Sequence, residues 1–277
     1  MKVGVIGNGF VGGATQLLKC KSIEVVVWDI LPDKRVPLTL ELSDLAECDF
    51  IFICVPTPMT VDNSCHTGIV EKVVNNLHEA RIDFSKTYVV IRSTVPPGTS
   101  SRLGCYFMPE FLTEKNWKND FYNCENWIVG KYDLDTDYFQ DLLTSAKNAD
   151  KIKYNKMIVV STTEGEMIKY SRNAFLATKI SFFNEIEEIC KHNGLNYDII
   201  KHCTSLDTRI GSSHMDVPGY DGKRGFGGTC LPKDINSLNN FMSKKCGIKS
   251  YILDAVCKRN DERDRPDKDW HNDRTIC

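Results

Sequence analysis

Short apolar runs alternate with stretches of helical periodicity through the first 160 residues of the chain. Each run is bounded by glycine, proline or polar residues, which is typical of buried strands. The runs lie at 2–6, 24–28, 50–55, 88–91, 105–107, 127–129 and 157–160. Residues 68–80, between the third and fourth runs, carry Ile69, Val73 and Leu77 on one helical face. Strands that alternate with helices predict an α/β fold with a Rossmann-like, doubly wound parallel sheet.

The pattern changes after residue 160, where helical periodicity takes over. Thr163, followed three residues later by Glu166, predicts the capping box of a long helix that reaches about His192 and ends at Gly194. An apolar stripe along this helix is formed by Phe175, Phe182, Ile186 and Ile189. A helix of about 30 residues is long for a globular protein. We therefore expect an all-helical central domain with one long helix, which serves as a spine or a dimer interface.

The end of the chain is dominated by charge. Ten of the twelve residues at 258–269 are charged, with alternating sign. Such a run is typical of a solvated helix end or a frayed terminus. The expected organisation is therefore a sheet domain at 1–160, a helical domain at 161–257 and a charged tail at 258–277.

The composition excludes classes of function without identifying one. The 277 residues carry a formal net charge of −2, with 42% apolar and 26% charged residues. These values argue against a nucleic-acid or membrane-surface partner, and no apolar run reaches the ~18 residues of a membrane helix. Twelve cysteines are scattered without the spacing of a metal site. The N-terminus enters a strand directly, without the features of a secretory signal. We expect reduced thiols, no metal and a cytoplasmic protein.

A glycine motif between the first two strands indicates a dinucleotide site. Gly7, Gly9 and Gly12 follow the first strand and open a helix, and Asp29 ends the second strand 20 residues after Gly9. In such motifs the glycines allow a tight turn, close approach of a pyrophosphate and close helix packing. A carboxylate at Asp29 accepts from a ribose hydroxyl and repels a 2′-phosphate, so the cofactor expected is NAD. Lys34 either reaches the same ribose or is an ordinary surface lysine.

A second glycine-rich loop leads to a cysteine. Residues 225–228 hold three glycines, Cys230 follows, and Lys233 and Asp234 come shortly afterwards. A thiol near cationic groups shifts toward thiolate, the form that attacks carbonyls, and Asp234 could act as a base toward water. Together with a nicotinamide cofactor, such a cysteine is suited to oxidising an alcohol to an acid through a thioester. A structural cysteine in a ligand-binding loop is the alternative.

Seven segments carry a family resemblance, and they occur in family order. They are GNGFVG at 7–12, VPTP at 55–58, STVPPGT at 93–99, PEFLTE at 109–114, EMIKYSRNAFLA at 166–177, RIG at 209–211 and the Cys230 loop. With these segments the chain resembles the UDP-glucose 6-dehydrogenases, within the UDP-glucose/GDP-mannose dehydrogenase family. The resemblance covers nearly the whole chain.

The resemblance implies a role for each matching position. The implied catalytic residues are Cys230 as nucleophile, Lys169 and Asn173 as donors to the substrate's C6 oxygen, and Asp234, Thr94 and Glu110 around the hydrolytic water. The implied cofactor-binding residues are Gly7, Gly9, Phe10, Val11, Gly12, Asp29, Lys34, Thr57, Glu114 and Lys233. The implied substrate-binding residues are Phe111, Leu112, Arg209, Lys223, Arg224, Phe226 and Gly227. In the family the counterpart of Arg209 reaches a neighbouring subunit's substrate, which fits a homodimer formed through the long helix.

Two departures from the family pattern affect these expectations. The segment 30–48 is short, so one helix of the sheet is expected to be missing or trimmed. The chain also ends before the family's C-terminal nucleotide-binding domain, which predicts a short form without that lid. Closure excludes water from such sites, so intact catalytic residues do not guarantee activity.

The leading hypothesis is NAD-dependent oxidation of UDP-glucose to UDP-glucuronate, a precursor for polysaccharide biosynthesis. It proceeds by two hydride transfers through a cysteine thiohemiacetal and thioester. One alternative is a non-catalytic or partner-dependent NAD-binding dimeric module. Another is the same chemistry on a different nucleotide sugar, such as GDP-mannose. In each case the expected partners are a small nucleotide sugar and a second subunit, without nucleic acid or membrane.

Overall fold

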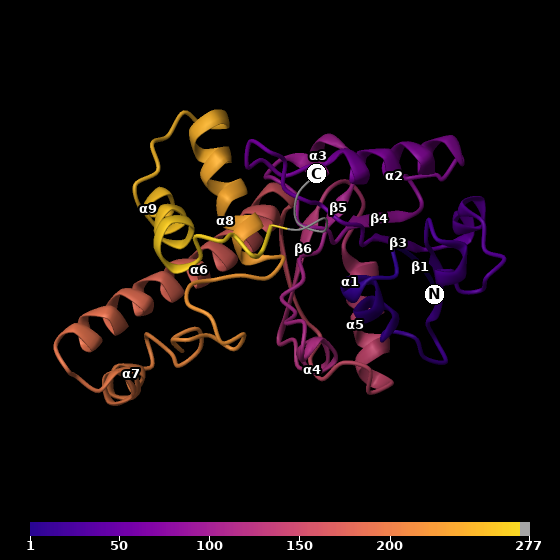
Figure 1. Ribbon diagram of the computed structural model, residues 1–277. Helices are drawn as coiled ribbons and strands as arrows, with labels where there is room; N and C mark the ends of the chain where they lie inside the picture. Colours follow the sequence, from indigo (N-terminus) through magenta and orange to yellow (C-terminus); the bar gives the residue numbers. More distant parts are fainter. Residues whose placement is uncertain (272–277) are drawn as a thin grey trace. The chain divides into compact units, whose positions relative to one another are not determined.

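The computed structural model describes residues 1–271; the last six residues of the expected charged tail, 272–277, lie outside the described residues. The chain forms two compact units. The first combines Met1–Thr57 with Thr67–Lys169, and the second combines Pro58–His66 with the chain from Tyr170 onward. The division therefore falls within the long helix, and a short segment after the third strand joins the second unit (Figure 1).

A seven-stranded sheet forms the centre of the first unit, in the order β2-β1-β3-β4-β5-β6-β7. The strands are β1 (Lys2–Ile6), β2 (Glu24–Trp28), β3 (Phe50–Ile53), β4 (Tyr88–Ile91), β5 (Tyr106–Phe107), β6 (Asn126–Lys131) and β7 (Lys156–Ser161). Neighbouring strands are parallel except β5 and β6, which pair antiparallel at Phe107 and Gly130. The predicted Rossmann-like sheet is confirmed, with this one reversal.

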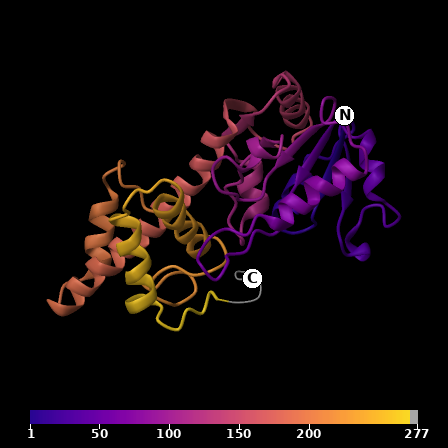
Figure 2. The same ribbon diagram turned by 90° about the horizontal axis from the view of Figure 1, so that it is seen from above.

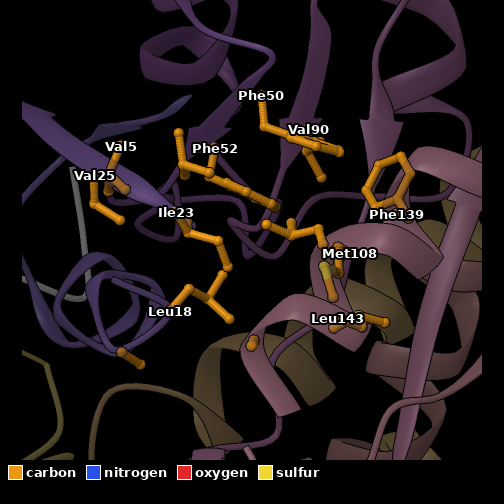
Figure 3. Packing of buried hydrophobic residues seen from close by; sticks show 14 of the residues in the cluster. Val5, Leu18, Ile23, Val25, Phe50, Phe52, Val90, Met108, Phe139 and Leu143 are labelled. Atoms are coloured by element: carbon orange, nitrogen blue, oxygen red, sulfur yellow. The ribbon is translucent and has the colours of Figure 1, made fainter. Parts of the chain in front are cut away.

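Both faces of the sheet are buried, which explains why its strands are apolar without alternation. The helices of this unit are α1 (Phe10–Gln16), α2 (Gly68–Glu79), α3 (Thr99–Arg102), α4 (Trp117–Tyr122) and α5 (Asp137–Asn148). Phe50 and Phe52 pack in a cluster with residues of α1, α4 and α5, whereas Ile51 and Ile53 pack in a second cluster with α2. Figure 2 shows the sheet between these helices. Figure 3 shows members of the first cluster, among them Phe50 and Phe52 of β3, Leu18 and Phe139.

The connection between β2 and β3 contains no α-helix. It consists of two short 3₁₀ turns, η1 (Pro32–Lys34) and η2 (Leu42–Glu47). Leu45 of the second turn is fully buried in the cluster that contains α2. The expected loss of a sheet helix is confirmed, and a 3₁₀ turn provides the apolar side chain that covers this part of the sheet.

The second unit is helical. Its elements are α6 (Thr162–His192, which starts in the first unit), α7 (Tyr197–Ser205), α8 (Leu231–Asn240), α9 (Ile252–Arg259) and two π-turns, η3 (Phe241–Lys245) and η4 (Asn260–Asp264). Gly194 follows α6 with a positive φ of 64°, the conformation that ends a helix most readily at glycine. A helical domain with one long helix is therefore confirmed (Figure 1).

The start of α6 differs from the prediction. The capping box is formed by Ser161 and Glu164: the Glu164 carboxylate accepts from the Ser161 N–H at 2.7 Å, and Ser161 Oγ accepts from the Glu164 N–H at 3.2 Å. The predicted box of Thr163 and Glu166 is wrong because α6 begins directly after β7, two residues earlier. Glu166 is buried and instead accepts from the backbone N–H of Ser100 at 2.7 Å, where it caps α3.

The charged tail is also different from the prediction of a solvated end. Within the described residues, Asp264 and Arg265 are 8% and 4% exposed. The charges of opposite sign satisfy one another: Arg265 donates to Asp269 at 3.0 Å, and Arg259 donates to Glu188 of α6 at 2.8 Å. Burial of charge requires such pairing. Residues 258–271 therefore belong to the packed second unit.

The apolar stripe of α6 is exposed within its unit. Phe175, Phe182 and Ile189 are 64%, 55% and 50% exposed. Among residues 1–271, no helix combines the length and apolar character needed to cross a bilayer.

Candidate active site

The glycine turn after β1 has the shape that its sequence predicts. Gly7 has φ +95°, and a Cβ there would lie 2.5 Å from the carbonyl oxygen of Cys54. A Cβ at Gly12 would overlap the Gly7 carbonyl, whereas no atom lies within 4 Å of a Cβ placed on Gly9. Close contacts with the protein's own backbone therefore require glycine at positions 7 and 12, whereas Gly9 faces open space. A pyrophosphate could approach the backbone there, at the start of α1.

Asp29 lies beside this turn. Its Oδ2 accepts from the Asn8 N–H at 2.7 Å and its Oδ1 from the Leu31 N–H at 2.9 Å. A carboxylate oxygen accepts more than one hydrogen bond, so this orientation remains compatible with ribose hydroxyls. Lys34 accepts with its backbone carbonyl from Asn8 Nδ2 at 2.8 Å, so it lies at the same turn. Phe10 is 52% exposed, so its ring offers an apolar surface where the glycine turn enters α1.

The other predicted positions of the first unit differ in exposure: these are the cofactor positions Thr57, Val11 and Glu114 and the catalytic position Thr94. Thr57 is buried and Thr94 half-buried, each beyond the carboxyl end of its strand. Their loops are joined by Ser93 Oγ, which accepts from the Val55 N–H at 2.9 Å and donates to the Val55 carbonyl at 2.7 Å. Val11 is half-buried in α1, and Glu114 is exposed. The carboxyl ends of neighbouring parallel strands are where such sheets bind ligands.

A buried ion pair joins α6 to the loop after β5. Lys169 Nζ donates to the Glu110 carbonyl at 2.7 Å and to its Oε1 at 2.8 Å, and both side chains are nearly buried. The ring of Phe111 lies 5.6 Å from the ammonium, and the Leu112 N–H donates to Glu110 Oε2 at 2.7 Å. Burial acts to raise the pKa of Glu110, but the Lys169 ammonium and these hydrogen bonds outweigh it and hold that pKa below its usual value.

A second buried cation, which was not among the residues predicted from the sequence, acts on Glu110. Arg92 directly follows β4, is 3% exposed, and donates from Nη1 to Thr15 Oγ1 of α1 at 3.0 Å. Its guanidinium lies 5.8 Å from the ring centre of Phe121, and its charge helps to lower the pKa of Glu110. An arginine placed immediately after a wholly apolar strand is the sequence signal that could have indicated a buried charge.

In the second unit the predicted catalytic residues lie close together at the start of α8. Asp234 is 1% exposed; its Oδ2 accepts from Asn173 Nδ2 at 2.6 Å and its Oδ1 from Lys233 Nζ at 2.5 Å. The Asp234 N–H donates to the Cys230 carbonyl at 2.9 Å. Asn173 lies one turn after Lys169 on α6. The structure therefore brings together three of the predicted residues, Asn173, Lys233 and Asp234, one turn from the predicted nucleophile.

Cys230 is the N-cap residue of α8, and it is exposed. Burial acts to lower the pKa of Lys233, but the adjacent Asp234 carboxylate outweighs it and raises that pKa above its usual value. The negative charges that Cys65 and Cys230 carry as thiolates act in the same direction. An ammonium and a helix N-terminus are surroundings in which a thiol ionises readily. Cys65, on the segment 58–66, also belongs to this cluster and was not predicted from the sequence.

The predicted substrate residues of the second unit are largely engaged by their own chain. Arg209 is exposed and pairs with Asp207 at 2.5 Å. Lys223 pairs with Asp269 at 2.6 Å, and Arg224 pairs with Glu187 and donates to the Asn184 carbonyl at 2.8 Å. Phe226 is buried, and a Cβ on Gly227 would overlap the Arg265 guanidinium. These residues form an ordered loop whose backbone conformation depends on glycine.

No cluster of three or more histidine, cysteine, aspartate or glutamate side chains suited to a metal ion is found within residues 1–271.

Family models match both units. Residues 31–146 match the NAD binding domain of the UDP-glucose/GDP-mannose dehydrogenase family. Residues 163–262 match the central domain of the same family.

Individual relatives agree with the family match. The Bacillus subtilis protein YtcA is 34% identical over 233 residues, which are 79% of this chain and 52% of the relative. The UDP-glucose 6-dehydrogenase of Rickettsia conorii is 31% identical over 236 residues, 80% of this chain and 51% of the relative. The chain thus spans about half the length of the curated relatives it matches.

Solved structures show the same fold. A UDP-glucose dehydrogenase from Pyrobaculum islandicum superposes with a TM-score of 0.78 at 26% identity, covering 94% of this chain and 68% of that one. A GDP-mannose dehydrogenase from Pseudomonas aeruginosa has a TM-score of 0.65 at 24% identity, covering 95% and 69%, and supports the fold alone.

Proposed function

The chain belongs to the UDP-glucose/GDP-mannose dehydrogenase family, with its NAD-binding and central domains, and we propose that it oxidises UDP-glucose to UDP-glucuronate. The observation that carries the proposal is the buried Asp234 carboxylate, held by Asn173 and Lys233 one turn after an exposed Cys230. This arrangement places a thiol nucleophile, a carboxylate base and the Lys233 donor at the start of α8, with a second donor, Asn173, on α6.

The first unit would hold NAD by its glycine turn and by Asp29. The open space at Gly9 admits the pyrophosphate, and the Asp29 carboxylate faces the turn through Asn8. A carboxylate there favours a ribose hydroxyl over a 2′-phosphate, which supports NAD over NADP. When bound, NAD supplies the acceptor for a hydride in each of the two oxidations.

In the first oxidation the substrate's C6 alcohol loses a hydride and a proton and becomes an aldehyde. Lys169 and Asn173 would donate hydrogen bonds to the C6 oxygen, where negative charge develops as its proton leaves. The pair is suited to this role because both side chains lie on successive turns of α6. Glu110, kept deprotonated by Lys169 and Arg92, holds the ammonium in place.

The second oxidation passes through Cys230. The thiolate sulfur forms a bond to the aldehyde carbon, and the oxygen takes up a proton to give a thiohemiacetal. Loss of a further hydride and of that proton leaves a thioester. Water then attacks the thioester carbon, the C–S bond breaks, and the products are the C6 carboxylate and the Cys230 thiol. Asp234 would orient the water and accept its proton.

The assay for this proposal measures NADH formed by purified protein from NAD and UDP-glucose. Two NADH per UDP-glucose are expected, and none from Cys230→Ser. NADH from GDP-mannose and not from UDP-glucose would select the same chemistry on another sugar, a possibility because the family model covers both substrates. NAD binding without NADH from any nucleotide sugar would contradict the proposed oxidation and favour a non-catalytic or partner-dependent module.

We also propose that the chain forms a homodimer through α6. The support is the exposed stripe of Phe175, Phe182 and Ile189, because large apolar side chains grouped on one helix face mark interaction surfaces.

A further inference from the structure

Asn260 holds the backbone of the glycine-rich loop. Its Oδ1 accepts from the Phe226 N–H at 2.9 Å and its Nδ2 donates to the Phe226 carbonyl at 3.1 Å. The amide thus satisfies both polar groups of one residue, as a neighbouring strand would. Asn260 is 1% exposed and Phe226 is 2% exposed, so water does not replace these bonds readily.

Two further side chains hold the adjoining peptide groups. Asn184 of α6 accepts from the Gly225 N–H at 3.1 Å. Arg265 donates from Nε to the Arg224 carbonyl at 2.8 Å and pairs with Asp221 of the same loop. Asn260 and Arg265 lie at opposite ends of the turn that follows α9, the segment expected from sequence to be solvated.

The loop depends on these side chains because it has no regular secondary structure of its own. Within 206–230 the chain forms only turns and bends, and it then enters α8 at Cys230. A Cβ on Gly225 would overlap Asn260 Oδ1, and Gly225 has a positive φ of 64°. The close contact with Asn260 is therefore one reason that residue 225 must be glycine.

We propose that Asn260 and Arg265 are positioning residues for nucleotide-sugar binding: they hold residues 224–226 in the conformation that receives the substrate. The inference rests on the proposed function and on the family resemblance, which implies that Lys223, Arg224, Phe226 and Gly227 bind the nucleotide sugar. Asn260 acts through the Phe226 backbone, and Arg265 acts through the Arg224 carbonyl and Asp221. A change at either site should weaken the substrate complex while leaving the cofactor turn of the first unit unaffected.

Three variants test the proposal. Asn260→Leu removes both hydrogen bonds, and Asn260→Asp keeps the acceptor and removes the donor. Arg265→Lys keeps the positive charge and removes the planar guanidinium that donates to two groups at once. For Asn260→Leu we expect the KM for UDP-glucose to rise about tenfold or more, with kcat and the KM for NAD within about threefold of wild type. Asn260→Asp and Arg265→Lys should fall between Asn260→Leu and wild type. The control is Asn123→Leu, which removes a similar amide-to-carbonyl bond, to Asn119, and should change neither KM.

Hydrogen exchange of the Phe226 amide provides a readout that does not need turnover. We expect fast exchange in Asn260→Leu and slow exchange in wild type and Asn260→Asp, where the acceptor remains. Lack of turnover by the wild-type chain would refute the proposed function. The exchange of the Phe226 amide can still be measured in that case, because it does not depend on turnover. The positioning role would be overturned by an unchanged KM for UDP-glucose in a folded variant whose Phe226 amide exchanges fast. It would also be overturned if neither Asn260 variant folded, because Asn260 would then be required for the whole unit.

Discussion

Lys169 and Glu110 are 59 residues apart in sequence, and Lys169 Nζ donates to both the backbone carbonyl and the carboxylate of Glu110. The pair is nearly buried, so each charge depends on the other. Removing one partner of a buried pair typically costs about 3–5 kcal/mol, because the remaining charge is left without compensation.

Lys169→Met is therefore expected to lower the free energy of unfolding at pH 7 by an amount in that range. In the wild type the pKa of Glu110 is below its usual value, so the pair stabilises the protein above about pH 4.5 and less as the pH falls further. In Lys169→Met, burial raises the pKa of Glu110, and protonation at lower pH relieves the uncompensated charge. Urea unfolding at pH 7 and pH 4.5 should show a smaller deficit at the lower pH. An equal deficit at both values would contradict the assignment.

Cys230→Ser should abolish NADH formation from UDP-glucose, because an alkoxide of serine is not available at neutral pH as a thiolate is. The matched control is Cys203→Ser, which changes another exposed cysteine of the second unit and should retain wild-type turnover. Comparable loss of activity in both variants would indicate a general effect of thiol removal and would refute the nucleophile assignment.

Gly12→Ala tests whether the glycine turn requires a residue without a side chain at position 12. A Cβ at Gly12 overlaps the Gly7 carbonyl, so we expect a loss of about 1–3 kcal/mol in unfolding free energy and a loss of NAD binding by calorimetry. Gly13→Ala is the control, since its Cβ would meet the Trp117 ring at an ordinary 3.6 Å. In a helix, alanine gains about 0.5–1 kcal/mol over glycine, so Gly13→Ala should be at least as stable as wild type. Retained NAD affinity in Gly12→Ala would contradict the role of this turn.

The ion pairs of Glu188 predict an acid-sensitive contact between α6 and the segment formed by the end of α9 and η4. Its carboxylate accepts from Arg259 at 2.8 Å and from Arg263 at 2.7 Å, and these hydrogen bonds lower its pKa to about 2. The stabilisation is present above about pH 4.5 and is lost as the pH falls toward 2. Glu188→Gln should cost about 1 kcal/mol at pH 7, because solvent screens its exposed part, and nothing near pH 2.

The control for this experiment is Glu185→Gln. Glu185 is 64% exposed and lies 3.8 Å from Arg259, so its replacement should have almost no effect at either pH. If Glu188→Gln lowered the free energy of unfolding equally at both pH values, the contribution of Glu188 would come from packing and not from its charge.

The proposed α6 interface makes a prediction about oligomeric state. Phe182→Glu places a charge within the exposed stripe and should convert a dimer to a monomer in size-exclusion chromatography with light scattering. Ile30→Glu, at a 76% exposed position of the first unit, should remain dimeric. A monomeric wild-type chain, or a dimer unaffected by Phe182→Glu, would exclude the proposed interface.

Features that depend on local backbone conformation can be predicted from the sequence. The glycine turn and the end of α6 at Gly194 follow from steric limits on a few adjacent residues. The strands of the sheet were also recognisable, because a parallel sheet buries both faces and its strands are continuously apolar.

Which distant groups compensate one another depends on how the chain folds. Glu166 is close enough to Thr163 in sequence to suggest a cap, yet it caps α3 because the chain beyond β4 is packed against it. Residues 258–269 look solvated because their charges are read without partners, but Glu188 and Asp221 supply those partners. A buried charge or amide is stable only when it meets its complement, and the fold, not the local sequence, brings Lys169 to Glu110 and Asn260 to Phe226.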